Sequence, residues 1–223
     1  MNREDRQIET EPDLPSPSPD DAAAREEALA LMRELERRPL HVQHVAQLSG
    51  QLFDQFAALH GLGSRDRLLL EASALLHDIG QAQDPFAEGH HNESARLIRE
   101  RRWRHFAPHE VEIISQVARY HRKSMPEMTH DEFRALALWD RGVVQRLAAL
   151  LRLADSFDRS HHQLVRQVRV EIRPNRIVFH LDAIGPVFRE LRSAQTKGDL
   201  AQAVFQRDLV FVVGDEVIEP PAS

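Results

Sequence analysis

The sequence contains no cysteine, so it can form no disulfide and offers no thiolate as a metal ligand or nucleophile. It also lacks any apolar run near the ~18–20 residues that a membrane-spanning helix needs. Residues 1–6 have none of the apolar character of a signal peptide. These absences predict a cytoplasmic protein with no membrane contact. Any metal site must use imidazole, carboxylate and water, and the chain has 13 histidines to supply the imidazoles.

The size and composition are those of a globular protein. The 223 residues are enough for one large domain, or for one domain with a small appendage. Apolar residues make up 42% of the chain and charged residues 29%. The net charge of -6 disfavours non-specific binding of nucleic acid, although local basic clusters can still contact a phosphorylated substrate.

The first two thirds of the chain carry mainly helical patterns. Residues 1–20 are predicted to be a disordered leader, because residues 9–21 are rich in Pro, Ser and Asp. Helical spacing of apolar residues begins after Asp20 or Asp21, either of which is a good N-cap, and continues with loops to about residue 162. We therefore expect a mainly α protein with an all-α helical domain over residues 21–162.

The periodicity changes after this helical region. Residues 168–172 and 177–181 alternate between apolar and polar, with Pro174 and Asn175 between them, which predicts a β-hairpin. A helical segment over 186–196 and a strand over 209–213 complete a small α+β appendage, residues 163–215, followed by a tail over 216–223. The sequence leaves open whether this appendage covers a site, mediates a homodimer or caps the helical core.

One dipeptide, His77-Asp78, ends an apolar helical run over residues 68–76. Imidazole and carboxylate are good ligands for a divalent metal. Asp155 lies in another mostly apolar helix, where an unpartnered carboxylate is costly to bury. Further ligand-type residues lie on or beside predicted helices: His44, His90, His91 and His121. Together these residues predict a metal site.

The same residues resemble a known pattern. His44, His77-Asp78 and Asp155 resemble the His…His-Asp…Asp signature of the HD-domain superfamily of metal-dependent phosphohydrolases. The sequence around them is similar to the C-terminal region of exopolyphosphatase/guanosine pentaphosphate phosphatase (Ppx/GppA) proteins over residues 40–213. The segments that carry this similarity include His-Asp-Ile-Gly at 77–80, Arg-Tyr-His-Arg-Lys at 119–123 and Leu-Arg-Leu-Ala-Asp at 151–155.

The resemblance implies a ligand set and a reaction. One divalent ion (Mn, Mg or Fe) would be held by His44, His77, Asp78 and Asp155. A second ion would be bridged by Asp78 and completed by His90 or His91, Glu93 and His121. Asp78 and Asp158 are the implied catalytic residues, and the implied phosphate clamps are Arg122, Lys123 and Arg159. A metal-activated water would then attack a phosphorylated small molecule, a nucleotide or polyphosphate.

Two departures from the family pattern matter. Its members are usually built around an actin-like ATPase-fold domain, for which this sequence has no room, so we do not expect the family's best-known activity to carry over. In addition, Glu93 stands where the family has the last histidine of a Gly-His-His-Lys-His-Ser segment. Because carboxylates also bind Mn²⁺, Mg²⁺ and Fe, the sequence leaves open whether the site holds one metal or two.

Other classes of function compete with the enzyme. A non-catalytic module that binds polyphosphate or nucleotides, or that dimerises, would fit the family, although the complete set of His44, His77, Asp78 and Asp155 favours catalysis or metal binding. A purely structural helical domain with hydrogen-bonded core histidines is a third interpretation. The basic segment over residues 99–105 is a weak footprint for nucleic acid in an acidic chain, and a solvated helix face explains it better.

Overall fold

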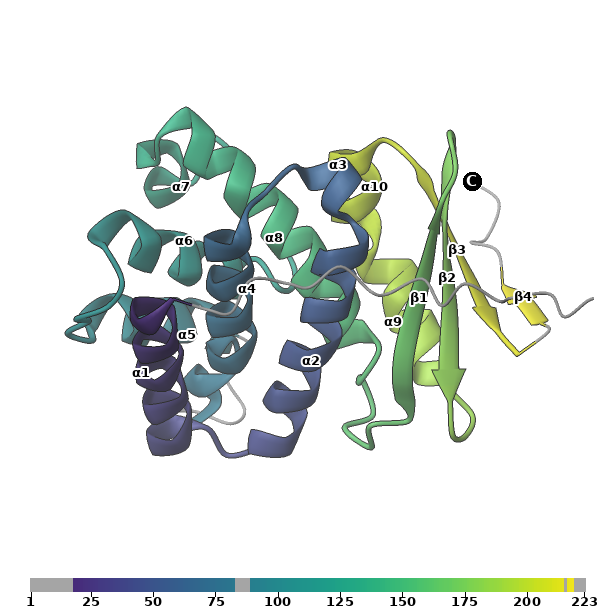
Figure 1. Cartoon of the computed structure of the whole chain (residues 1–223), viewed down its shortest axis with the longest axis horizontal. Coiled ribbons are helices and arrows are strands. Elements are labelled where there is room, and N and C mark those ends of the chain that lie inside the picture. Colours follow the sequence, from purple (N-terminus) through teal and green to yellow (C-terminus); the bar gives the residue numbers. More distant parts are fainter. Residues whose placement is uncertain (1–17, 83–88, 215, 219–223) are drawn as a thin grey trace, which may run out of the picture.

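A computed structural model describes residues 18–82, 89–214 and 216–218. It confirms the expected class, a mainly helical part followed by a small part that contains a mixed sheet. Figure 1 shows the helices at one end of the molecule and the sheet at the other. Residues 1–17 of the leader predicted over 1–20, the loop around Pro85 and the last residues of the tail (219–223) lie outside the described residues, while Pro19 and Asp20 belong to the first helix. No helix in the described ranges has the length and apolarity to cross a membrane.

The helices of the first part follow one another with short connections. Their bounds are α1 Pro19–Leu35, α2 Pro39–Gln55, α3 Ala57–His60, α4 Ser64–Leu76, the 3-10 helix η1 Ile79–Ala82, α5 His90–Glu100, α6 Pro108–Arg119, α7 Asp131–Ala135 and α8 Leu138–Ser156.

Helix α1 begins slightly earlier than the sequence predicts. Ser18 is the N-cap, and its Oγ accepts a hydrogen bond of 3.1 Å from the backbone N–H of Asp21. Pro19 then occupies the first helical turn, where its missing N–H is no loss. Asp20 and Asp21, predicted as caps, instead lie in the first turn, where their negative charges interact favourably with the helix dipole and stabilise the helix.

Helix α4 is the centre of the helical part. It contacts α1, α2, α6 and α8, and most of its side chains are buried, as expected for a helix that is apolar on nearly all sides. Its last residue is Leu76, so His77 and Asp78 come directly after it, as the sequence predicts. Helix α5 begins at His90 rather than at residue 94, which places His90 and His91 in a helical first turn instead of a loop.

The appendage contains a four-stranded sheet with the order β1-β2-β3-β4. β1 (Val165–Ile172) and β2 (Arg176–Ala183) form the predicted antiparallel hairpin. β3 (Asp208–Val213) runs parallel to β2, and the crossover that a parallel pair requires is made by α9 (Phe188–Lys197) and α10 (Asp199–Phe205). β4 (Glu216–Ile218), in the segment predicted as a tail, pairs antiparallel with β3.

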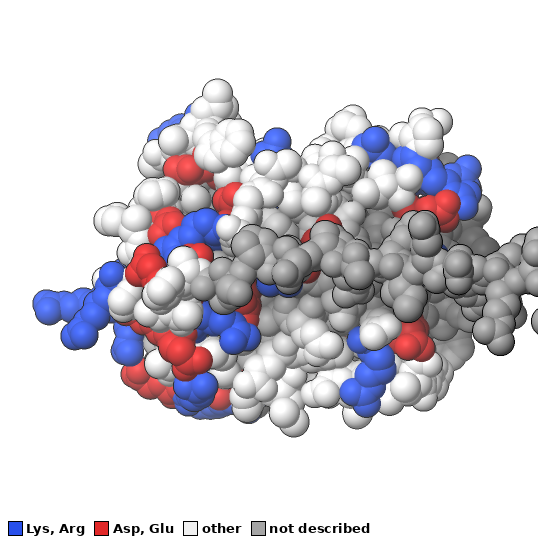
Figure 2. Space-filling view, viewed as in Figure 1, with Lys and Arg blue, Asp and Glu red and all other residues white. Residues whose placement is uncertain are grey.

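One hydrophobic core joins the helices to the sheet. Helix α2 packs against β1, while α9 and α10 pack against α8. The ring of Phe179 in β2 lies between the ends of two helices. Its centroid is 6.0 Å from that of Phe56, which follows α2, and 6.0 Å from that of Phe157, which follows α8. Phe179 in turn stacks on Phe211 of β3 at 5.3 Å. The outer surface is different, since Figure 2 shows acidic and basic side chains interspersed at the helical end of the visible face.

Candidate metal centre

Five buried ligand-type side chains meet where α2, α4, α6 and α8 come together. We call His41, His77, Asp78, His121 and Asp155 the His/Asp cluster. Two groups of three have ligand atoms that all lie within 4.8 Å of one another: His41, His77 and Asp155, and His77, Asp78 and His121. All five residues are buried. The sequence-predicted residues His77, Asp78, His121 and Asp155 are thus brought together.

Two of the histidines are oriented by the helices that precede them. The backbone carbonyl groups in the last turn of a helix have no partner within the helix. His77 Nδ1 donates to one of these, the carbonyl oxygen of Ala74, at 2.7 Å, and His121 Nδ1 donates to that of Ala118 at 2.6 Å. Because a carbonyl can only accept, Nδ1 of each ring carries the proton. Nε2 of each ring therefore faces the cluster.

His41 is oriented by a carboxylate instead. Its Nδ1 donates to Asp158 Oδ2 at 2.8 Å, and its Nε2 lies 3.5 Å from Asp155 Oδ1. Burial lowers the pKa of His41, but the hydrogen bonds to Asp155 and Asp158 outweigh it and raise the pKa to about 9. A histidine whose Nδ1 is held by a carboxylate and whose Nε2 points to a shared centre is typical of metal ligands.

The two carboxylates of the cluster stay ionised. Asp78 Oδ1 lies 3.3 Å from His90 Nε2, 3.7 Å from His121 Nε2 and 3.8 Å from His77 Nε2. Burial raises the pKa of Asp78, but the neighbouring imidazoles hold it well below its usual range. Burial acts in the same way on Asp155, where the charge of Lys197 and the hydrogen bond from His41 keep the pKa well below its usual range.

Asp158, expected to be catalytic, has both of its oxygens engaged. Oδ2 accepts from His41, and Oδ1 accepts the backbone N–H of Gln163 at 2.7 Å. The side chain is fully buried. In this arrangement Asp158 positions His41, and it also fixes the turn that leads from α8 into β1.

His44 lies elsewhere than the sequence predicts. Its Nε2 is hydrogen-bonded to the carbonyl oxygen of Val165 in β1 at 2.9 Å, and it belongs to neither group of ligand atoms. His41 lies one turn earlier on the same face of α2, and it is His41 that meets Asp155. The helical spacing alone could not separate the two, because residues three apart share a face but differ by about 4.5 Å along the axis. Of the two, His41 is the α2 imidazole that the structure brings to the His/Asp cluster.

Of the residues that follow Gly89, His90 contacts the cluster, and His91 and Glu93 belong to neither group of ligand atoms. His90 contacts Asp78, as described above, while Arg122 Nη1 lies 3.2 Å from His90 Nε2. His91 is buried, and burial together with the charge of His90 lowers its pKa to about 4. Glu93 is turned toward Arg96, whose guanidinium it holds with two hydrogen bonds of 2.6 and 2.9 Å. The structure thus does not bring the Glu93 carboxylate to the cluster.

The expected phosphate clamps lie around the cluster at different depths. Arg122 is half-buried against His90, whereas Lys123 and Arg159 are exposed. A cation that the sequence did not suggest is Arg38, whose Nη1 lies 3.3 Å from His161 Nδ1. The His161 ring stacks on His41 with 4.0 Å between centroids. Arg38 therefore lies beside His161, whose ring covers His41 of the cluster.

Two more residues escaped the sequence analysis. Glu36, between α1 and α2, accepts the backbone N–H of Arg38 through Oε1 at 2.7 Å, while its buried Oε2 has no hydrogen-bond partner among the described residues. Burial raises the pKa of Glu36, and the negative charge of Asp78 adds to the effect. Lys197 of α9 forms an ion pair with Asp155 Oδ2. Glu36 lies in a connection and Lys197 at the end of a helix, and only the folded chain shows that both come close to the cluster.

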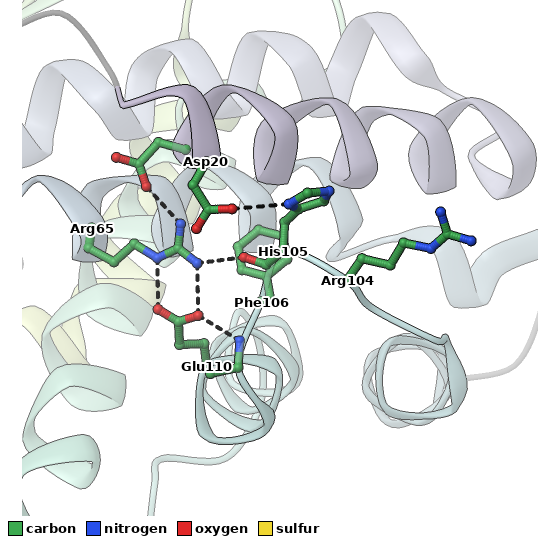
Figure 3. A pocket seen from close by; sticks show the side chains of 8 residues that line it. Asp20, Arg65, Arg104, His105, Phe106 and Glu110 are labelled. Carbon is green, nitrogen blue, oxygen red and sulfur yellow. Dashed lines mark hydrogen bonds and ion pairs between the residues drawn. The ribbon is translucent and has the colours of Figure 1, made fainter.

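A separate hollow of about 490 Å³ on the helical end is not part of this centre. Figure 3 shows that its Arg65 is already surrounded by acceptors. The guanidinium binds both oxygens of Glu110, at 2.7 and 2.8 Å, as well as Asp21 at 2.7 Å and the carbonyl oxygen of His105 at 2.7 Å. With its donors used in this way, Arg65 ties α1, α4 and α6 together and has little left for a phosphate.

Comparison with known proteins places the chain in a family. A family model described as Ppx/GppA phosphatase, domain III, matches residues 26–189. The matched stretch contains all five residues of the His/Asp cluster and ends before Lys197. No curated protein matches the chain.

Proposed function

The chain belongs to the Ppx/GppA phosphatase domain III family, and we propose that its His/Asp cluster binds a divalent cation and hydrolyses a phosphate ester or anhydride. One observation carries the proposal. Three imidazoles, each fixed through Nδ1, direct Nε2 toward two ionised carboxylates in a buried place. Buried ligand atoms arranged in this way are costly without a cation to satisfy them.

The donor set fits a divalent ion. Nε2 of His77 is buried without a hydrogen-bond partner among the described residues, which is a cost that coordination would remove. His41, His77, Asp78 and Asp155 would hold the first ion, and nitrogen and oxygen ligands of this kind suit Mn, Fe or Mg. Each lone pair serves one ion, so a second ion would depend on Asp78 as a bridge, with His121 and His90 nearest to it.

The chain's own residues would bind and orient the substrate. At a site of this kind a divalent ion supplies activation of water and neutralisation of phosphate charge. Asp158 would keep the Nδ1 proton of His41 in place, so that Nε2 is the nitrogen that gives up its proton when an ion binds. Arg122 and Arg38, on two sides of the cluster, would hold the negative oxygens of a phosphorylated small molecule, a nucleotide or polyphosphate.

The second candidate is a module that binds polyphosphate or a nucleotide without turnover. The ion pair between Lys197 and Asp155 favours it, because it neutralises one of the two carboxylates with no divalent ion present. Such a module would bind the phosphorylated ligand through the same cations but would release no phosphate.

Metal analysis combined with a substrate panel tests the proposal. After loading with Mn²⁺, Fe²⁺ or Mg²⁺, we expect the purified protein to retain metal and to release phosphate from polyphosphate, guanosine tetraphosphate or a simpler nucleotide. Asp78→Ala is the blank and should lose both properties, while His44→Gln is the matched histidine control and should keep both. Retained ligand binding without phosphate release would favour the binding module, and a protein that retains no metal would refute the enzyme.

A further inference from the structure

The appendage contributes a charged side chain to the His/Asp cluster. Lys197, the last residue of α9, reaches across to α8 and forms an ion pair with Asp155 Oδ2. The other oxygen of the same carboxylate, Oδ1, faces His41 Nε2 at 3.5 Å and His77 Nε2 at 3.9 Å. One carboxylate is therefore shared between a lysine side chain and the place where a divalent ion would bind.

The position of Lys197 is fixed by its surroundings. The buried guanidinium of Arg152 donates to the carbonyl oxygen of Lys197 at 3.1 Å and to Asp199 Oδ1 at 2.7 Å, so it holds both sides of the turn between α9 and α10. Gly198, within that turn, is packed so closely that a Cβ would lie 2.6 Å from Leu209 and 2.7 Å from the oxygen of Ala194. The turn is thus anchored to α8, one helical turn from Asp155.

The residue type also matters. The sequence has two lysines, Lys123 and Lys197, among 29 basic residues. An ammonium is a compact point charge that can contact one carboxylate oxygen, whereas a guanidinium would tend to bind both oxygens in parallel. At this position a lysine leaves Oδ1 of Asp155 open toward the cluster.

We propose that Lys197 competes with the divalent cation for Asp155. The inference rests on the proposed metal site. Lys197 keeps the buried carboxylate neutralised when no ion is bound, confines coordination to Oδ1 and lowers the affinity of the site through repulsion between like charges. Lys197 is a positioning residue in this account, because it acts through Asp155.

Replacing the ammonium tests the competition. We expect Lys197→Met to bind Mn²⁺ at least about tenfold more tightly than the unaltered protein in calorimetric titration, since a repulsive charge beside the ion is removed. In the presence of a chelator its thermal midpoint should be lower, because Asp155 loses its ion pair with Lys197, and added Mn²⁺ should raise it by more than in the unaltered protein. Arg192→Met is the control, since Arg192 is exposed on the same helix and its loss changes the net charge equally; its affinity should stay unchanged.

The outcomes separate the two proposals. If the unaltered protein binds Mn²⁺ and Lys197→Met binds it equally or more weakly, the competition is refuted while the metal site stands. If neither protein binds Mn²⁺, Fe²⁺ or Mg²⁺, the metal site itself is refuted and the competition with it. Should Lys197→Met not fold, Lys197→Gln keeps an N–H donor for Asp155 without the charge, and the same gain in affinity is expected of it.

Discussion

At the scale of single residues, the direction of each histidine's second nitrogen separates metal ligands from structural histidines. His41 and His44 share a face of α2, yet one points to Asp155 and the other to the backbone of β1. We expect His41→Gln to weaken Mn²⁺ binding by at least about tenfold, as a lost ligand should. His44→Gln should leave the affinity unchanged and lower the free energy of unfolding by about 1 kcal/mol, through the lost bond to Val165. Titration and urea unfolding of both variants measure these effects, and the reverse pattern would restore His44 as the ligand.

Asp158 acts on the cluster through His41. Its carboxylate holds the Nδ1 proton of that ring and has no oxygen left for a substrate. We expect Asp158→Asn to lower metal affinity by about 10–100-fold, the usual effect of losing a group that orients a ligand. Metal titration together with the pH profile of phosphate release measures this. If Asp158 were instead a catalytic base, the variant would bind metal normally and lose only the rate.

Single residues also show what the sequence can and cannot predict about the site. His77-Asp78 and Asp155 could be identified, because each is polar in an apolar helix that has to be buried. The choice between His41 and His44 depends on the height of α2 relative to α8, which no local pattern records. Glu36 comes from the connection between α1 and α2, and Lys197 from the polar end of α9, so only the tertiary packing shows that they lie close to the cluster.

At the scale of elements, Arg65 joins three helices through paired carboxylates. Its interactions lower the pKa of Glu110 below 4.5 and that of Asp21 below 3.8. Carboxyl groups with a lowered pKa in the folded state stabilise the protein fully above their ordinary pKa, and this contribution is lost as the pH falls through the folded-state value. The network should therefore stabilise the fold at neutral pH, and this stabilisation should be lost in acid as the two carboxyl groups become protonated.

Glu110→Gln tests this contribution. We expect the variant to lose about 1 kcal/mol of stability at neutral pH, a modest value because the network is only partly buried. Its stability should then fall less than that of the unaltered protein as the pH drops below about 4.5. Thermal unfolding measured across that range decides the question, and parallel curves for the two proteins would show that the network does not stabilise the fold.

The elements themselves were largely predictable from periodicity. The β1–β2 hairpin follows from two alternating runs around Pro174 and Asn175, and α4 follows from its apolar run. The short α7 and β4 were missed because both are too brief to show a period. The early start of α5 was missed because two histidines after a glycine read as a loop, whereas contacts with η1 and α6 hold them in a helical turn.

At the scale of the whole molecule, the shared core predicts that helices and sheet unfold together. Phe179 of β2 is fully buried and contacts the rings of Phe56, Phe157 and Phe211. We expect Phe179→Ala to cost about 3–5 kcal/mol. The unfolding transitions followed by far-ultraviolet circular dichroism and by aromatic signals should coincide, in the variant and in the unaltered protein alike. Two separate transitions would mean that the appendage folds on its own.

The ion pair between Lys197 and Asp155 places one of the two lysines at the contact between the appendage and the helical part, where amine chemistry can probe it. With two lysines in the sequence, an acylating reagent has two side-chain targets besides the chain's amino terminus. Lys123 is exposed, whereas the Lys197 side chain is 19% exposed and held by a buried carboxylate. The extent of labelling at Lys197 relative to Lys123 can be read by peptide mass spectrometry. It would thus report how often the contact between the appendage and the helical part opens. The ratio needs no ligand, no cofactor and no engineered probe.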